Sequence, residues 1–223
     1  MLSDAEMDRI TAAVAKAETA TSGEILCVVT GEVSDYRETP LAWAAAAALI
    51  LPPAAVGLGL NLDRLAAPFA GWTAAHGAAA TGPLLSAYAL LQAAVFVLVM
   101  AGVGMAPVRR VLTPRPLKRR RVRKAALQHF AGARHLLDPE KTAILIFASL
   151  EDRQMEIVAD PIIDAKVDQS VWDGAIAAAL AEIAKDGPAA GLSKAVELCG
   201  AALAEHFPDD GAANAFPDRP VQI

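Results

Sequence analysis

Residues 84–105 read LLSAYALLQAAVFVLVMAGVGM and contain no charged side chain. An α-helix needs about 20 apolar residues to cross the roughly 30 Å hydrocarbon core of a bilayer. Residues 40–60 form a second uncharged run of similar length, although Pro52 and Pro53 should kink or break a helix there. Together the two runs predict a transmembrane hairpin over residues 39–108. The alternative interpretation is a buried core hairpin in a soluble protein.

The composition of the whole chain agrees with a membrane protein. Of the 223 residues, 55% are hydrophobic and 20% are charged, and the mean hydropathy is +0.37. Soluble domains carry more charge than this, and disordered chains are poor in apolar residues, so disorder is excluded as the main state. The two cysteines, Cys27 and Cys199, are too few to form a disulfide scaffold in a chain of this length.

Basic side chains gather directly after the second uncharged run. Nine Lys and Arg residues lie between residues 109 and 124, whereas no Asp or Glu occurs over residues 64–137. Short flanks rich in Lys and Arg stay in the cytoplasm, so we expect the loop at residues 61–82 to lie outside and both termini to be cytoplasmic.

The basic segment has three interpretations. It sets the membrane topology without any further role, it contacts anionic lipid headgroups, or it binds nucleic acid. The last is disfavoured because no aromatic side chain lies within the segment to stack on bases, so no nucleic-acid partner is expected. The residues predicted to contact lipid headgroups are Arg109, Arg110, Lys118, Arg119, Arg120 and Arg121.

The segment before the hairpin, residues 1–38, predicts one helix and one strand. Ser3 and Glu6 have the spacing of a capping box at the start of a helix. Residues 25–30 (ILCVVT) are apolar and β-branched, which is typical of a buried strand. One helix and one strand cannot form a core alone, so their partners must come from the chain after the hairpin.

The segment after the hairpin supplies these partners. We expect a helix over residues 118–134 and two antiparallel strands over residues 142–150 and 154–159, the second nearer to a sheet edge with Glu156 on an exposed face. Two further helices follow. Strands interleaved with helices favour an α/β sandwich. Residues 109–207 are predicted to contain the basic segment and the remainder of the domain. Residues 208–223 are predicted to be a loosely held tail.

Several motifs in order resemble the TPM domain family. They are ATSGEILCVVT (residues 20–30), AILIFASLEDRQMEIVADPIIDAKV (residues 143–167), Trp172, CGAALAEHFP (residues 199–208) and PDRPVQI (residues 217–223). The resemblance is to a bacterial membrane branch in which a transmembrane hairpin interrupts the domain. It implies a TPM-type α/β sandwich in a multi-pass protein of the bacterial inner membrane. One departure is the sequence Lys-Thr-Ala at residues 141–143, where the family usually has Arg-Thr-Gly.

Carboxylates near strand ends are the candidates for metal binding. Asp160 follows the second predicted strand, Asp164 comes four residues later, and Glu24 precedes the first strand. Ligands of α/β proteins often bind at strand ends, and carboxylate oxygens suit Ca²⁺ or Mg²⁺. The alternative is that Asp160, which precedes a proline, and Glu24 are ordinary turn residues.

Two functions follow from these observations. The sequence contains no phosphate-binding glycine loop, zinc-protease motif or nucleophile elbow. A membrane-anchored, non-enzymatic interaction or accessory module with a protein partner is therefore the first hypothesis. The second is a divalent-metal-dependent, phosphatase-like hydrolase, since some members of the TPM family are linked to metal binding and phosphatase activity.

Overall fold

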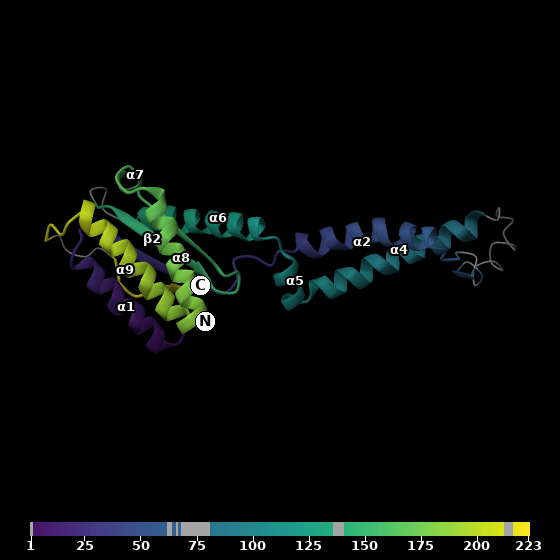
Figure 1. The fold of residues 1–223 in the computed structure, drawn as a ribbon, viewed down its shortest axis with the longest axis horizontal. Helices are drawn as coiled ribbons and strands as arrows, with labels where there is room; N and C mark the ends of the chain where they lie inside the picture. The colour runs from purple at the N-terminus through teal and green to yellow at the C-terminus, as the bar shows by residue number, and fades with distance from the viewer. Residues whose placement is uncertain (1, 62–63, 66, 68–80, 136–140, 212–215) are drawn as a thin grey trace. The chain divides into compact units, whose positions relative to one another are not determined.

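The chain divides into two compact units, which are described separately. The computed structural model describes residues 2–61, 64–65, 67, 81–135, 141–211 and 216–223 (Figure 1). One unit comprises residues 1–34 and 115–223, and the other comprises residues 35–114. We call them the α/β unit and the hairpin unit. The α/β unit is thus assembled from both ends of the chain.

The unit boundaries differ by a few residues from the predicted boundaries at residues 38 and 109. The hairpin unit includes helix α5 (Ala106–Leu112), which carries Arg109 and Arg110. The indole Nε1 of Trp43 donates a hydrogen bond to the carbonyl oxygen of Leu112 over 3.3 Å, which ties α5 to the hairpin. Most of the predicted loop at residues 61–82 lies outside the described residues.

The α/β unit contains one mixed sheet of four strands in the order β3-β2-β1-β4. These are β1 (Glu24–Thr30), β2 (Ala143–Ser149), β3 (Gln154–Ala159) and β4 (Val221–Gln222). Strand β1 runs parallel to β2 and β4, whereas β2 and β3 form an antiparallel pair. The predicted β-hairpin and the edge position of its second strand are confirmed.

The C-terminal residues correct the expectation of a loosely held tail. Val221 and Gln222 pair with Val28 and Val29, so the chain ends in the sheet. The outer edge of β1 offers backbone groups that must find partners, and the last residues supply them. Arg219 adds ion pairs to Asp4 and Asp8 of the first helix, at 3.2 and 3.4 Å.

Three helices cover one face of the sheet. They are α1 (Asp4–Glu18), α8 (Gln169–Asp186) and α9 (Pro188–His206), and a short helix, α7 (Pro161–Asp164), follows β3. The predicted capping box is present, because the side chains and backbone amides of Ser3 and Glu6 bond reciprocally. The large core on this face includes Ile10, Val14, Ile144, Ile146, Trp172, Leu192, Val196, Cys199 and Leu203.

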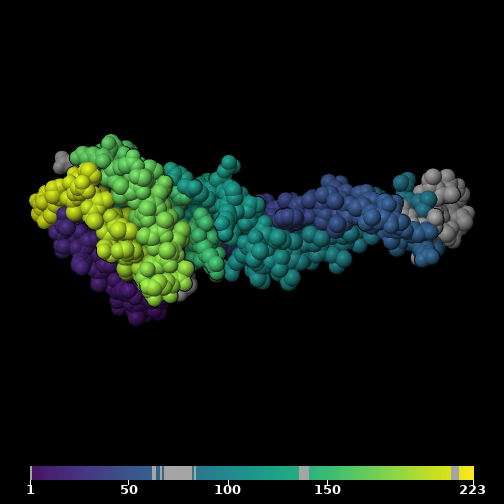
Figure 2. Space-filling view, viewed as in Figure 1, coloured from purple at the N-terminus to yellow at the C-terminus, as the bar shows by residue number. Residues whose placement is uncertain are grey.

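One helix, α6 (Arg115–Arg134), covers the other face. Its Val122, Ala126 and Phe130 pack against Val28, Leu145 and Phe147 in a second core cluster. The sheet therefore lies between two helical layers, and the predicted α/β sandwich is confirmed. In Figure 2 the purple residues of α1 lie beside green and yellow residues of the C-terminal half, because segments from both ends of the chain interleave in this unit.

The hairpin unit consists mainly of two long helices, α2 (Glu38–Gly57) and α4 (Thr81–Gly104). Pro52 and Pro53 were expected to kink or break the first helix, and they do not break it, since α2 continues through both to Gly57. Membrane-type helices tolerate proline where neighbouring groups satisfy the freed carbonyls. Both helices are long and apolar enough to span a membrane.

Candidate functional site

In the described part of the hairpin helices, the few buried side chains are small or medium-sized, whereas many large apolar side chains are exposed. Ala44, Ala48 and Ala87 are buried. By contrast, Leu49 is 67% exposed and Leu98 is 71% exposed. A core helix of a soluble protein has the opposite arrangement, whereas helix pairs in membranes pack through small residues and turn large ones toward lipid. The hairpin surface is thus suited to a hydrocarbon environment.

One of the six residues predicted to contact lipid headgroups is buried in the α/β unit. Lys118 is a correction, because its side chain is only 11% exposed and its Nζ lies 4.0 Å from Oδ1 of Asp152. It shares the buried stripe of Val122, Ala126 and Phe130 at spacings of four residues. That spacing is the sequence signal that identifies Lys118 as inward-facing.

The other five predicted residues differ in their surroundings. Arg119 lies 3.5 Å from a carboxylate oxygen of Glu156, and Arg121 donates a hydrogen bond to the hydroxyl of Ser34. Arg120 is exposed on α6. Arg109 and Arg110 are half-buried on α5, in the hairpin unit.

Glu156 is buried, which corrects the expectation of an exposed strand face. Its side chain is 5% exposed because α6 covers this side of β3. Nη1 of Arg123 lies 3.1 Å from one carboxylate oxygen of Glu156, and Nε of Arg119 lies 3.5 Å from the other. Glu156 can be buried at this position because Arg119 and Arg123 compensate its charge.

The three predicted metal ligands do not form a common site. Asp160 accepts hydrogen bonds from Nε of Arg134 at 3.0 Å and from the backbone amide of Ala143 at 2.8 Å. Glu24 pairs with Nζ of Lys141 at 2.8 Å. Asp164 is exposed on α7. Among the residues that the structure describes, no group of three or more His, Cys, Asp or Glu side chains is placed to hold a metal ion.

This donor set does not fit a divalent cation. Asp160 and Glu24 each already neutralise a cation of the chain itself, so Ca²⁺ or Mg²⁺ would have to displace Arg134 or Lys141. The sequence showed the carboxylates but not their partners, because Arg134 lies 26 residues and Lys141 lies 117 residues away in the chain. Metal binding at these residues therefore stays a prediction without support from the geometry.

Neither cysteine offers a reactive nucleophile. Cys27 and Cys199 are buried and are not joined in a disulfide. Burial raises the pKa of Cys27, and it raises that of Cys199 to about 12. Since the thiolate is the reactive form of cysteine, both thiols are inert near neutral pH.

A carboxyl group next to β1 titrates near neutrality. Burial raises the pKa of Glu18 to about 7, and the nearby charges of Glu24 and Asp218 add to this effect. Its Oε1 accepts a hydrogen bond from the backbone amide of Ile25 at 2.8 Å, which partly offsets the rise.

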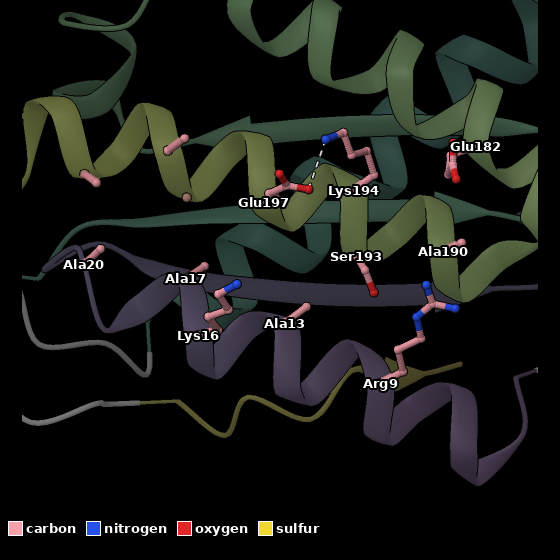
Figure 3. Close-up of a pocket in the computed structure, with 13 residues that line it drawn as sticks. Arg9, Ala13, Lys16, Ala17, Ala20, Glu182, Ala190, Ser193, Lys194 and Glu197 are labelled. Atoms are coloured by element: carbon pink, nitrogen blue, oxygen red, sulfur yellow. Dashed lines mark hydrogen bonds and ion pairs between the residues drawn. The ribbon is translucent and has the colours of Figure 1, made fainter.

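A surface groove of about 600 Å³ runs between α1 and α9. Ala13 and Ala17 of α1 and Gly200, Ala201 and Ala204 of α9 are among the small residues that line it (Figure 3). The charged lining residues are Arg9, Lys16, Glu182, Lys194 and Glu197. The sequence does not predict this groove, because small residues indicate close helix contact without showing which helices pair.

Comparison with known proteins supports the fold. No family model and no curated protein matches this sequence. The NMR structure of the BA42 protein from the psychrophilic bacterium Bizionia argentinensis is similar, with a TM-score of 0.56 and 16% identity. The match covers 100% of this chain and 96% of that chain. At this identity, the likeness bears on the fold alone.

Proposed function

We propose that this chain is a membrane-anchored protein of the TPM type that acts as a non-enzymatic interaction or accessory module at the cytoplasmic face of a bacterial inner membrane. The observation that carries the proposal is the burial pattern of the hairpin, where the few buried side chains, such as Ala44, Ala48 and Ala87, are small and many leucines are exposed. The basic residues that follow the second span support the cytoplasmic assignment of the α/β unit.

The α/β unit supports an interaction role more than a catalytic one. The buried carboxylates Glu24, Asp152, Glu156 and Asp160 each lie beside a cation of the chain. Three of these pairs connect α6 to the sheet or to the loops at its strand ends, and charges paired in this way are not free to act on a substrate. The metal-dependent hydrolase, the second hypothesis from the sequence, gains no support from this arrangement.

Membrane extraction tests the anchoring. We compare the wild-type chain with Leu49→Asp combined with Leu98→Asp, and with Leu49→Phe combined with Leu98→Phe as the matched control. An aspartate near the centre of a spanning helix costs about 3 kcal/mol, whereas phenylalanine is accepted. The wild type and the phenylalanine pair should stay in alkaline-washed membranes, and the aspartate pair should be released. Release of the wild type by the same wash would contradict the proposal.

A further inference from the structure

We propose that the groove between α1 and α9 docks an acidic amphipathic helix of a partner protein. The inference rests on the proposed function, because a tethered module without a catalytic site acts through a binding surface. Charge, shape and an unused hydroxyl group each indicate the chemistry of the occupant. All three are properties of the α/β unit alone.

The charge of the groove comes from one wall. Arg9 and Lys16 lie on α1, and neither has an acidic partner among the residues that the structure describes. The other charged lining residues are already paired, Lys194 with Glu197 at 3.0 Å and Glu182 with Lys185 at 3.8 Å. The groove therefore presents two uncompensated positive charges, which favour a negatively charged occupant.

The spacing of these cations favours a helix over a small anion. Arg9 and Lys16 are seven residues apart on α1, which corresponds to about 10 Å along the helix axis. Figure 3 shows the two side chains apart along α1, with Ala13 between them, so in this arrangement a single small anion contacts one of them at a time. Two acidic side chains at i and i+7 on a partner helix have the matching separation.

The shape of the groove suits bulky apolar side chains. The two helices approach so closely that a Cβ on Gly200 would lie 2.7 Å from Cβ of Ala17. The alanines on either side leave a shallow hollow, with Ala201 exposed at its edge. Leucines between the two acidic residues of a partner helix would fill this hollow, as in other helix-in-groove complexes.

Ser193 adds a polar contact within the groove. Figure 3 shows its hydroxyl directed toward α1, between the levels of Arg9 and Ala13. The Oγ atom is buried and has no hydrogen-bond partner among the described residues. A buried hydroxyl without a partner is costly. If the Ser193 side chain rotates toward the groove, a polar side chain of the docked helix would satisfy it.

Fluorescence anisotropy of the full chain in zwitterionic lipid nanodiscs tests the proposal. The probe is a fluorescent helical peptide with two glutamates seven residues apart and leucines on the face between them. The control peptide has glutamines in place of the glutamates. We expect saturable binding of the glutamate peptide, and about tenfold weaker binding or less for the glutamine peptide.

Variants of the chain locate the binding. Arg9→Glu combined with Lys16→Glu should weaken binding about tenfold or more by reversing the charge. Ala201→Leu should weaken it without any change of charge, because the leucine fills the hollow from an exposed helix position. Arg115→Glu combined with Lys124→Glu makes the same charge change on the exposed side of α6, away from the groove, and should leave binding unchanged. Thermal unfolding of each variant verifies that it folds.

Three outcomes of the peptide assay would overturn the proposal. They are no binding by the wild type, equal binding of the glutamine peptide, and binding that the groove variants do not reduce. Binding of anionic lipid vesicles through Arg9 and Lys16 in place of the peptide would also overturn it, in favour of a membrane contact. Failure of the anchoring proposal is measured separately, by alkaline extraction, and leaves the peptide assay interpretable.

Discussion

Asp152 joins three segments of the α/β unit that are far apart in the sequence. Its Oδ2 accepts hydrogen bonds from the amide of Val33 at 3.3 Å and from the hydroxyl of Ser149 at 2.8 Å. Nζ of Lys118 on α6 lies 4.0 Å from its Oδ1. Its side chain is fully buried, so the loss of one member of this group leaves the others without compensation.

Replacing Asp152 by alanine should lower the free energy of unfolding by about 3 to 5 kcal/mol, because Lys118 is then left buried and unpaired. Urea unfolding of the full chain in detergent, followed by tryptophan fluorescence, measures this loss. The matched control is Asp164→Ala, which removes an exposed carboxylate on α7 and should cost about 0.5 kcal/mol or less. Equal losses in the two variants would contradict the role given to Asp152.

Glu18 should make stability depend on pH. Its folded pKa of about 7 is above the ordinary value of 4.5, so between these values the folded state holds a proton that the unfolded state has lost. Its contribution to stability is therefore complete below 4.5 and is lost as the pH rises to about 7. Glu18→Gln keeps an acceptor for Ile25 and should remove this slope from urea midpoints measured across the range. An unchanged slope would contradict the assignment.

At the scale of elements, α8 and α9 pack unusually closely at Gly191. A Cβ at Gly191 would lie 2.3 Å from Cγ1 of Ile183 and 2.5 Å from the backbone oxygen of Ala179. Contacts this short require the backbone of one helix to move. Gly174, in the middle of α8, has no atom within 4 Å of the same position.

Replacing these two glycines by alanine should change the stability of the protein in opposite directions. Gly191→Ala should destabilise the protein by about 1 to 3 kcal/mol, because the added methyl group forces the helices apart. Gly174→Ala should stabilise it by about 0.5 to 1 kcal/mol, since alanine is the better helix former. Thermal unfolding compares the two variants with the wild type. Stabilisation by both would show that the helices are not in close contact at Gly191.

The sequence predicted where helices and strands lie better than it predicted which of their faces are buried. Alternation in β3 identified Met155 and Ile157 as one side of the strand and Glu156 as the other. It did not show that α6 covers that other side, because Arg123 lies 33 residues from Glu156 in the chain. The same limit applies to β4, where two residues, Val221 and Gln222, become a strand only because the edge of β1 is available.

At the scale of the whole molecule, the core of the α/β unit is independent of the hairpin. Within the part of the chain that the structure describes, neither hydrophobic core cluster includes a residue from 35–114. Arg121 also donates a hydrogen bond to Ser34 at 2.9 Å, and Arg115 lies about 9 Å along the helix from Arg121. A short linker can therefore join the two ends.

Replacing residues 35–114 with a short Gly/Ser linker should give a folded, water-soluble α/β unit. Its circular dichroism should show helix and strand with a cooperative thermal transition, because both core clusters are retained. The matched control carries Asp152→Ala in the same shortened chain and should unfold at a lower temperature. An aggregated product, or one without a cooperative transition, would mean that the hairpin is part of the fold.

Thiol labelling in intact bacterial cells tests the central claim. In this account the hairpin crosses the membrane and returns, so that one domain forms from both ends of the chain on the cytoplasmic side. Native Cys27 and Cys199 are buried with raised pKa values and give little background. A membrane-impermeant maleimide should label Thr73→Cys in intact cells, and should label Ala12→Cys on α1 and Asp210→Cys after α9 only after lysis. Labelling of either of these two in intact cells, or protection of Thr73→Cys until lysis, would contradict the account.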